Sequence, residues 1–362
     1  MSNLLLNTIK IKGWRNYAGE NLNFGPGINL LLGNNGQGKT NLLEAIYFLS
    51  GGQSPRTNKL EELIKFDENY FYIRGEVAVG QELKVLEMGG ARDGRRMHKI
   101  QGVAVHRLSD FSDYFCAVFF LPEDLNLVKS GPAIRRRFLD QELSKINNKY
   151  RNSIEKYKKF LQQRNALLKS NIEDKILMQV LTNKIAELAG PISKLREDYI
   201  EKLSLLARLR HRKISGGREE LSLAYKHSVP PGAAVEDILA MFDDAKEAER
   251  KYRTTIIGPH RDDFAFIVNG MELRTFGSQG QQRTAVLSLK LAELELIKAE
   301  TGEYPLLLLD DVFSELDEQR REMLLHYLSG RIQTFISSSE PVDAGNEVRT
   351  FWIEAGTIKE RV

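Results

Sequence analysis

The spacing of apolar residues changes twice along the 362-residue chain and divides it into three zones. In the first zone, short apolar runs alternate with polar and glycine-rich stretches, a pattern typical of β-strands. The predicted strands are Leu4–Lys12, Ile28–Leu32, Tyr70–Val79, Lys84–Met88 and Ala117–Phe120, and a helix is predicted at Leu42–Leu49, stopped by Gly51 and Gly52. This zone therefore has mixed α/β character.

In the second zone the apolar period lengthens to three or four residues. From Leu139 to Ile172 this period predicts one long amphipathic helix. A second helix is expected to end at Ala189, where Gly190 and Pro191 would break it. A third helical stretch carries Leu195, Tyr199, Leu203 and Leu206, and a charged helix around Glu236–Tyr252 closes the zone. Together these stretches predict a helical lobe.

Strand signals return from Ile256 onward. The runs Phe264–Val268 and Met271–Thr275 flank Asn269-Gly270, a strong hairpin signal. A helix at Gln281–Ala299, the run Leu306–Leu309, another helix and the strand Thr334–Ser337 then alternate as α/β units do. We expect one α/β domain built from residues 1–128 and 256–362, with a helical lobe at 129–255 inserted in its middle.

Composition narrows the class of protein. With 42% hydrophobic and 28% charged residues the chain is neither disordered nor of low complexity, and its apolar runs are too short for a membrane span. The N-terminus lacks a signal-peptide pattern, so we expect a cytoplasmic protein without a membrane partner. The lone cysteine, Cys116, excludes an internal disulfide and a cysteine-clustered metal site. Because the net charge is only +3, any argument for nucleic acid must rest on where the charges lie.

The strongest motif is a complete G-x-x-x-x-G-K-[ST] phosphate loop between a predicted strand and a predicted helix. In such a loop, backbone N–H groups cradle phosphate at a helix N-terminus, the lysine reaches the β- and γ-phosphates, and the hydroxyl ligates Mg²⁺. Lys39 and Thr40 take these roles here; the alternative is a Gly/Asn-rich turn before a helix. The predicted ATP-binding residues are Gly33, Asn34, Asn35, Gly36, Gln37, Gly38, Lys39, Thr40 and Asn41.

A second acidic element completes such a site. The run Leu306–Leu309 is followed by Asp310, which we expect to hold Mg²⁺ together with Thr40, and by Asp311, placed to orient or deprotonate the attacking water. Lys39 and Asp311 are thus the predicted catalytic residues. The alternative for this stretch alone is a pair of carboxylates that cap the next helix.

Between these elements, Ser278-Gln279-Gly280-Gln281 opens a predicted helix, and here the sequence resembles the ABC ATPase superfamily. The signature loop of that superfamily touches ATP held by a second subunit, so the resemblance implies a contact in trans from Ser278 to Gln281. Ser314 and Asp317 are similar to its D-loop. Taken singly, each string is also compatible with a polar helix cap.

A helical insertion between the two ATPase halves is how SMC-type ABC proteins are built, and the short arm resembles the RecF family. Strings that carry this resemblance are Trp14–Tyr17, Gly33–Asn41, Leu121–Leu125, Arg135–Asp140, Gly258–Asp263 and Gly277–Thr284. The resemblance implies an ABC-type ATPase head (P-loop NTPase, α/β) with an inserted helical lobe. It further implies cofactors ATP and Mg²⁺, and a slow, DNA-stimulated hydrolysis of ATP to ADP and phosphate.

The same resemblance implies partners and a cellular role. ATP would join two heads into a homodimer that clamps single-stranded, double-stranded or gapped DNA. With a RecR-type mediator it would help to load recombinase, in recombinational repair, replication and the SOS response. Two rival functions remain: the ATPase subunit of a membrane transporter, which needs no basic arm, and a non-hydrolysing structural clamp.

Two departures from the wider ABC pattern predict slow turnover. The second acid of the strand motif is Asp311 and not glutamate, and Thr334–Ile336 is followed by three serines, Ser337 to Ser339, where a switch histidine would stand.

The candidate DNA surface is a basic stretch, residues 129–169, which carries twelve Lys/Arg against three acids. Segregated positive charge is the footprint of phosphate-backbone binding. The alternatives are a solvated helix face, or arginines that pair with Asp140 and Glu142. The predicted DNA contacts are Arg135, Arg136, Arg137, Lys145, Lys149 and Arg151, and a second basic cluster comprises Arg92, Arg95, Arg96, His98 and Lys99.

One further string, His260-Arg261-Asp262, is similar to a kinase catalytic loop only in these three letters, because the companion kinase motifs are missing. It is either a polar turn stabilised by its own side chains or a family-specific contact, and no chemistry is assigned to it.

Overall fold

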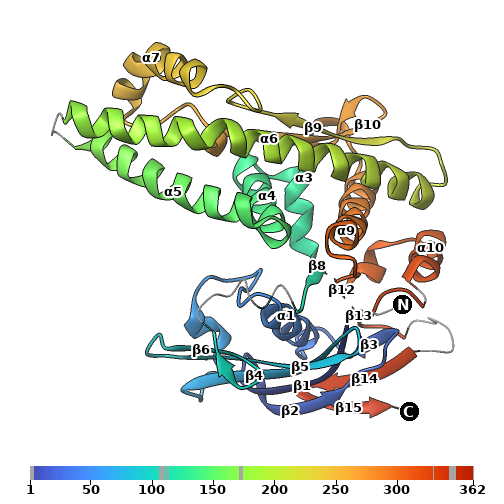
Figure 1. Ribbon diagram of the computed structural model, residues 1–362. Coiled ribbons are helices and arrows are strands. Elements are labelled where there is room, and N and C mark those ends of the chain that lie inside the picture. The colour runs from blue at the N-terminus through green and yellow to red at the C-terminus, as the bar shows by residue number, and fades with distance from the viewer. Residues whose placement is uncertain are drawn as a thin grey trace. The chain divides into compact units, whose positions relative to one another are not determined.

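The computed structural model describes residues 4–105, 111, 114–170, 174–328, 330–341 and 348–361. They fall into two compact units, coloured along the chain in Figure 1. The first unit comprises residues Met1–Asp124, Lys213–Ser215 and Lys290–Val362, and the second comprises Leu125–Arg212 and Gly216–Leu289. Among the described residues, no helix combines the length and apolarity that crossing a bilayer requires.

The first unit contains an antiparallel sheet in the order β2-β1-β4-β5-β6-β7. Its long strands β1, β4 and β5 alternate buried apolar residues with more exposed ones, as expected for a sheet with one face in the core. The strands are β1 (Leu5–Trp14), β2 (Tyr17–Asn23), β4 (Tyr70–Val79), β5 (Glu82–Ala91), β6 (Arg96–Ile100) and β7 (Val103–Ala104).

The second sheet of this unit has the order β15-β14-β3-β13-β12-β8, with parallel pairing everywhere except between β14 and β15. Its central strands are buried at every residue, which explains their continuous apolar runs. The strands are β3 (Ile28–Leu32), β8 (Ala117–Phe120), β12 (Leu306–Asp310), β13 (Thr334–Ser338), β14 (Val348–Glu354) and β15 (Thr357–Arg361).

Helix α1 (Lys39–Leu49) contacts strands of both sheets, and its Phe48 joins an aromatic cluster in their shared core. Trp14 packs against Phe71 and Phe48 with ring centroids 4.9 and 5.1 Å apart. The unit also holds η1 (Leu60–Leu63), η2 (Pro122–Leu125, whose last residue opens the second unit), η4 (Val312–Glu315) and α10 (Glu318–Leu328). This core fixes the loop that precedes α1 relative to the ends of β3 and β12.

The second unit is mainly helical, with one three-stranded antiparallel sheet in the order β11-β10-β9. Helix α9 begins in this unit and ends in the first. The helices are α3 (Asn126–Lys129), α4 (Pro132–Ile146), α5 (Asn148–Lys169), α6 (Lys175–Ile214), α7 (Val235–Tyr252), η3 (Pro259–Arg261), α8 (Leu273–Phe276) and α9 (Gln279–Thr301); the strands are β9 (Leu221–Lys226), β10 (Asp263–Val268) and β11 (Met271–Glu272).

The prediction of one long helix over 139–172 is wrong, because α4 ends at Ile146 and α5 begins at Asn148. Asn147 adopts an extended conformation, and its side chain accepts a hydrogen bond of 2.8 Å from the Tyr150 N–H. This N-cap restarts the helix. The apolar period could not show the break, because Tyr150 and Ile154 continue the buried stripe across it.

The predicted helix break at Pro191 is also wrong, because α6 continues through it. Proline removes one N–H donor from a helix but does not oblige the helix to end. The preceding Gly190 is required by a close approach: a Cβ there would lie 2.5 Å from the Ala233 carbonyl oxygen. The Gly190 carbonyl accepts a hydrogen bond from the Gly232 N–H instead.

The hairpin at Asn269-Gly270 is confirmed, with Val268 paired to Met271 and positive φ at both turn residues. Its second strand is shorter than predicted, since the chain turns into α8 at Leu273. Sequence reasoning missed β9, which pairs with β10 along its whole length. Because this pairing joins the inserted segment to residues beyond 256, the compact unit extends to Leu289, past the boundary expected at residue 255.

Candidate functional site

The phosphate loop lies between the end of β3 and the start of α1, as the sequence predicts. Gly33, Gly36 and Gly38 all have positive φ, a backbone region that favours glycine. A Cβ at Gly33 would lie 2.3 Å from the Ile353 carbonyl oxygen, so the loop also needs glycine for a close approach. The exposed turn Asn34–Gly36 leaves its backbone open to a ligand.

Lys39, the first residue of α1, folds back over this loop. Its Nζ donates to the carbonyl oxygens of Gly33 and Asn34 at 2.6 and 2.9 Å. Burial lowers the pKa of the Lys39 ammonium, while the nearby carboxylates Asp311 and Asp310 act in the opposite direction. The lysine is thus held as a buried point charge at the centre of the loop, where a polyanion would be stabilised.

The next side chain, Thr40, meets the acid at the end of β12. Its hydroxyl lies 2.8 Å from Asp310 Oδ2 and 3.0 Å from Oδ1. Burial raises the pKa of the Asp310 carboxyl, and hydrogen bonds from Ser337 and Thr40 counter that rise. A hydroxyl and a carboxylate side by side are oxygen donors of the kind that Mg²⁺ prefers.

Ser337, at the end of β13, is also a site residue. From the sequence it is notable only because a serine stands where a switch histidine would be expected. Its hydroxyl donates to Asp310 Oδ1 at 2.6 Å and accepts the Asp311 N–H at 2.9 Å. One buried serine therefore orients both consecutive acids. The parallel pairing of Asp310 with Ser337 brings them together, and only the strand register shows it.

Asp311 leaves the strand in the left-handed region, with φ 50°. A non-glycine residue there is sparsely populated and persists only where its surroundings hold it, which the Ser337 bond to its N–H does. Its carbonyl accepts a hydrogen bond of 2.7 Å from the Ser314 hydroxyl. Asp317, the other predicted D-loop residue, caps α10 by accepting the Arg320 N–H at 2.9 Å.

Polar side chains next to the phosphate loop form hydrogen bonds that the sequence does not predict. Two of them lie in the string Trp14–Tyr17, which carries part of the family resemblance. The Tyr17 hydroxyl donates to the Gly38 carbonyl at 2.8 Å, and Asn16 Nδ2 donates to the Gln37 carbonyl at 3.0 Å. Asn16 Oδ1 accepts from Asn41 Nδ2 at 2.9 Å. These bonds hold the loop in its open shape.

The signature-like loop is a capping box at the start of α9. Ser278 accepts the Gln281 N–H at 3.2 Å, and the Gln281 side chain accepts the Ser278 N–H at 2.9 Å. Ser278 and Gln279 are exposed and Gly280 is half-buried, so the loop is accessible from outside the chain. The helix-cap alternative is therefore correct for Ser278, and it is compatible with a contact in trans, which stays a prediction.

A series of hydrogen-bonded side chains within the second unit connects to this loop. Gln281 Nε2 donates to Glu219 Oε1 at 2.9 Å, and Glu219 Oε2 lies 3.1 Å from His211 Nε2. His211, on α6, is fully buried, and its other ring nitrogen lies 3.2 Å from the Ser288 hydroxyl on α9. The signature-like loop is thereby tied to the end of the longest helix.

The predicted DNA contacts in residues 129–169 are only partly available. Arg135 is buried and binds Asp263 through two hydrogen bonds of 2.6 and 2.9 Å, so its prediction as a DNA contact is wrong. It also donates to the carbonyls of Leu127 and Ser130, which makes it an internal brace. The expected alternative partners, Asp140 and Glu142, bind Arg196 and Lys145 instead.

The other five predicted contacts differ in exposure. Arg136 donates to the Asp262 carbonyl at 2.9 Å, and Arg151 donates to the Ser144 carbonyl. Lys145 lies against Glu142 at 2.8 Å and is mostly covered. Arg137 and Lys149 are exposed. A charge count alone could not separate the exposed cations from those that hold the fold.

The string Gly258–Asp263 anchors η3 through His260 and the buried Asp262, while Arg261 is exposed. Asp262 accepts from Arg196 at 2.9 Å and from Tyr225 at 2.5 Å, while the Tyr157 hydroxyl lies 2.7 Å from His260 Nδ1. Burial lowers the pKa of His260 to about 4. The polar-turn alternative is therefore correct: these side chains hold η3 against α5 and α6.

The fold and the phosphate loop define the class of protein, an ATPase head of the SMC-like ABC type. A family model described as RecF/RecN/SMC N terminal domain matches residues 5–346. The chain is 40% identical to a protein named DNA replication and repair protein RecF from Listeria monocytogenes serotype 4b, over 98% of this chain and 99% of that one. A protein of the same name from Staphylococcus aureus is 40% identical to this chain, over 95% of this chain and 95% of that one. The chain belongs to the RecF family.

Solved structures agree with this assignment. Two structures described as the recombination mediator protein RecF in the RecFOR pathway, with ATPrS and with ATP, match with TM-scores of 0.91 and 0.92 at 37% identity. They cover the whole of this chain and 99% and 98% of those chains. An Smc head domain from Pyrococcus furiosus matches with a TM-score of 0.59 at 16% identity, which shows the shared fold alone.

Proposed function

We propose that this chain is an ATP-dependent DNA-binding protein of recombinational repair, with roles in replication and the SOS response. The observation that carries the proposal is the arrangement around the phosphate loop. Lys39, Thr40 and Asp310 meet at the ends of two parallel strands, with Thr40 and Asp310 in direct contact. A relative at 37% identity, matched over the whole of this chain and 98% of its own, is described as RecF-ATP, which supports ATP as the nucleotide.

Mg²⁺ fits this site by the chemistry of its donors. The Thr40 hydroxyl and the Asp310 carboxylate would hold it, and the ion would supply charge that neutralises the phosphate oxygens of ATP. Lys39 would bind the β- and γ-phosphates, and the open turn Asn34–Gly36 would donate N–H groups to them.

Asp311 is the proposed base for hydrolysis. It follows the metal-binding acid directly, and Ser337 fixes its backbone. Aspartate is one methylene shorter than the glutamate usual in ABC ATPases, and Ser337 occupies the strand end where a switch histidine would stand. Both substitutions support slow hydrolysis of ATP to ADP and phosphate.

A composite site between two copies explains the exposed capping box. Ser278 to Gln281 would grip the γ-phosphate of ATP bound by the other head, using the hydroxyl and N–H groups at the start of α9. ATP would then join two heads, and the homodimer would clamp single-stranded, double-stranded or gapped DNA. A RecR-type mediator is the proposed partner for loading recombinase.

Exposed cations on α4 and α5, among them Arg137 and Lys149, are the proposed DNA contacts of the clamp. Binding through phosphates gives little preference for base sequence. The rival transporter subunit would require a membrane protein and no DNA, and the rival structural clamp would bind ATP without turnover.

The experiment that tests this function is an ATP titration of the wild-type chain and of Lys39→Met, followed by a DNA titration of each with ATP and Mg²⁺. We expect Lys39→Met to lose ATP binding, because the phosphate site loses its buried point charge. ATP-dependent binding of gapped DNA should disappear with it. Equal ATP affinity of the two proteins would show that the phosphate loop is not the nucleotide site.

A further inference from the structure

The antiparallel sheet of the first unit has a basic-aromatic face that the proposed nucleotide site does not use. On β1, Ile9 and Ile11 are buried while Lys10 and Lys12 are exposed. On β4, Phe71 and Ile73 are buried. Tyr70 and Tyr72 alternate with them along the strand and therefore point to the opposite side of the sheet. A hollow of about 960 Å³ opens on that side; we define the basic-aromatic face by Lys10, Lys12, Tyr70, Tyr72 and Arg95, all of which line it.

The rings of two tyrosines are left uncovered on this face because their partners on the adjacent strand β5 are small. Tyr72 pairs across the sheet with Gly89 and Tyr70 with Ala91, so no large side chain covers the rings from β5. Tyr70 is 42% exposed, a large fraction for an aromatic residue on a strand. The Tyr72 hydroxyl donates to Glu87 at 2.6 Å, which fixes its ring.

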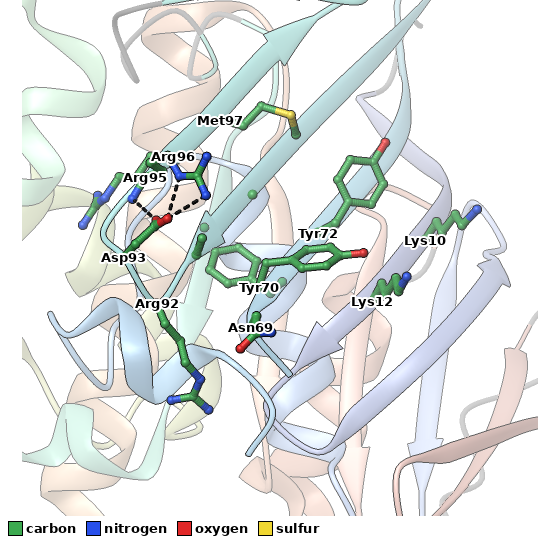
Figure 2. A pocket seen from close by; sticks show the side chains of 14 residues that line it. Lys10, Lys12, Asn69, Tyr70, Tyr72, Arg92, Asp93, Arg95, Arg96 and Met97 are labelled. Atoms are coloured by element: carbon green, nitrogen blue, oxygen red, sulfur yellow. Dashed lines mark hydrogen bonds and ion pairs between the residues drawn. The ribbon is translucent and has the colours of Figure 1, made fainter. Parts of the chain in front are cut away.

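Positive charge flanks the rings on two sides. Figure 2 shows Lys10 and Lys12 on one side of Tyr70 and Tyr72, with Arg95 on the other. The Lys12 ammonium lies 5.3 Å from the centroid of the Tyr70 ring. Of the described residues that line the hollow, five are cationic and one is acidic, and that one, Asp93, is paired with Arg95 at 2.6 Å.

We propose that the basic-aromatic face binds single-stranded DNA, with a base stacked on Tyr70 and neighbouring phosphates against Lys10 and Lys12. Exposed aromatic rings bordered by cations are the physical requirement for binding a single strand, because every unpaired base offers a π-face and every nucleotide a charge. A duplex hides the faces of its bases, so it would use the cations and leave the rings without a role.

This inference deepens the proposed function, on which it rests for the choice of DNA as the ligand. It adds a site that is separate in sequence from the cations of α4 and α5. At this site the protein would bind the single-stranded part of a gapped DNA. A single strand would satisfy the cations with its phosphates and cover the open Tyr70 ring with a base, so it uses both features of the face.

The test measures the affinity of a dye-labelled oligothymidylate for the full chain by fluorescence anisotropy, without nucleotide. Tyr70→Ala should weaken binding by about 5- to 150-fold, the range that loss of one stacked base produces. Tyr70→Phe keeps the ring and should bind within about twofold of wild type, a much smaller change than stacking loss gives. Replacing Lys10 and Lys12 by glutamine should lower the log–log salt slope by about 0.7 per lost contact.

Tyr252→Ala is the matched control. Tyr252 is also exposed, at 64%, and the Lys251 ammonium lies 5.7 Å from its ring centroid, but it lies on α7 of the second unit. It should bind the oligonucleotide as wild type does, and melting curves of all variants should coincide. Wild-type affinity in a folded Tyr70→Ala variant would overturn the proposal, as would an equal loss in Tyr252→Ala.

A parallel titration separates this proposal from the proposed function. If wild type shows ATP-dependent binding of gapped duplex while Tyr70→Ala retains full oligothymidylate affinity, the proposed function stands and the basic-aromatic face fails. If ATP has no effect on any DNA but Tyr70→Ala alone loses the oligonucleotide, the face stands and the clamp fails. A Tyr70→Ala variant that keeps the oligonucleotide but loses a RecR-type mediator would assign the face to a protein and overturn the proposal.

Discussion

The Thr40 hydroxyl lies 2.8 Å from the carboxylate of Asp310, although 270 residues separate them in the chain. The contact joins the first turn of α1 to the last residue of β12. It forms because β3 and β12 flank β13 in one parallel sheet, so their carboxyl ends meet at the same edge. An Mg²⁺ bound by these two oxygen donors would complete the proposed nucleotide site.

The Ser337 hydroxyl donates a hydrogen bond to Asp310, and Ser337→Ala tests what this bond contributes to the carboxylate. The Ser337 hydrogen bond lowers the pKa of Asp310 against the effect of burial, so its loss should raise that pKa further. Protonated Asp310 cannot hold Mg²⁺, and Mg²⁺-dependent ATP binding should therefore require a higher pH in the variant. Binding measured across pH checks this shift; Ser338→Ala, which removes the neighbouring hydroxyl bound to the Glu340 carbonyl, should leave the profile unchanged.

Asp311→Asn should keep ATP and Mg²⁺ but lose turnover, because it removes the basic oxygen and retains the size of the side chain. Asparagine also tolerates the left-handed backbone at this position, so the variant should fold normally. Phosphate release measured beside ATP affinity separates the two effects. Hydrolysis at the wild-type rate would make Asp311 a structural residue.

Ser278→Arg should leave ATP binding by the single head intact and abolish ATP-dependent dimerisation, because the long cation would fill the pocket for a γ-phosphate from the other copy. The lost helix cap should cost about 1 kcal/mol of stability, too little to unfold the chain. Thr275→Arg, at an exposed position on α8, controls for added charge. Loss of ATP binding by the monomer would place Ser278 in its own subunit's site.

Arg135→Ala should destabilise the protein by about 3–5 kcal/mol, since it leaves the buried side of Asp263 without its partner. Lys149→Ala, at an exposed position near the start of α5, should leave the melting temperature unchanged and weaken DNA binding equally at every sequence. Melting curves and salt-dependent DNA titrations of both variants distinguish the roles. A stable Arg135→Ala variant with weakened DNA binding would reverse them.

His260 makes stability depend on pH in a defined window. Its folded pKa of about 4 lies below its ordinary value of 6.5, so the unfolded chain takes up a proton first as the pH falls. The contribution of neutral His260 to the free energy of unfolding is complete above pH 6.5 and is lost as the pH falls towards 4. In this window the free energy of unfolding changes by up to about 1.4 kcal/mol per pH unit. Urea unfolding of wild type and His260→Gln across this window measures it, and parallel curves for the two proteins would contradict the assignment.

The sequence predicted the elements that obey local rules. The strand at Ile28–Leu32, the phosphate loop and the hairpin at Asn269-Gly270 follow from apolar runs and glycine positions, and the structure has them where expected. Two local predictions failed. Pro191 stays inside α6, with the buried residues Ala189 and Ile192 on either side of it. Asn147 interrupts a continuous apolar stripe with a helix cap.

The candidate site shows the same division. Lys39 and Asp310 were predictable because each lies in a motif with a fixed chemistry. The role of Ser337 depends on the strand register, which no motif encodes. Its basic neighbourhood predicts that Arg135 contacts DNA, because the sequence does not show its partner Asp263, 128 residues further along the chain.

The central claim, that ATP joins two copies of this chain into a DNA-binding clamp, is tested most directly by the mass of the protein in solution. Light scattering should give the monomer mass of about 41 kDa without nucleotide, twice that mass with ATP and Mg²⁺, and a further increase when gapped DNA is added. Asp311→Asn should hold the doubled mass longest. A mass that ATP does not change, with or without DNA, would contradict the account.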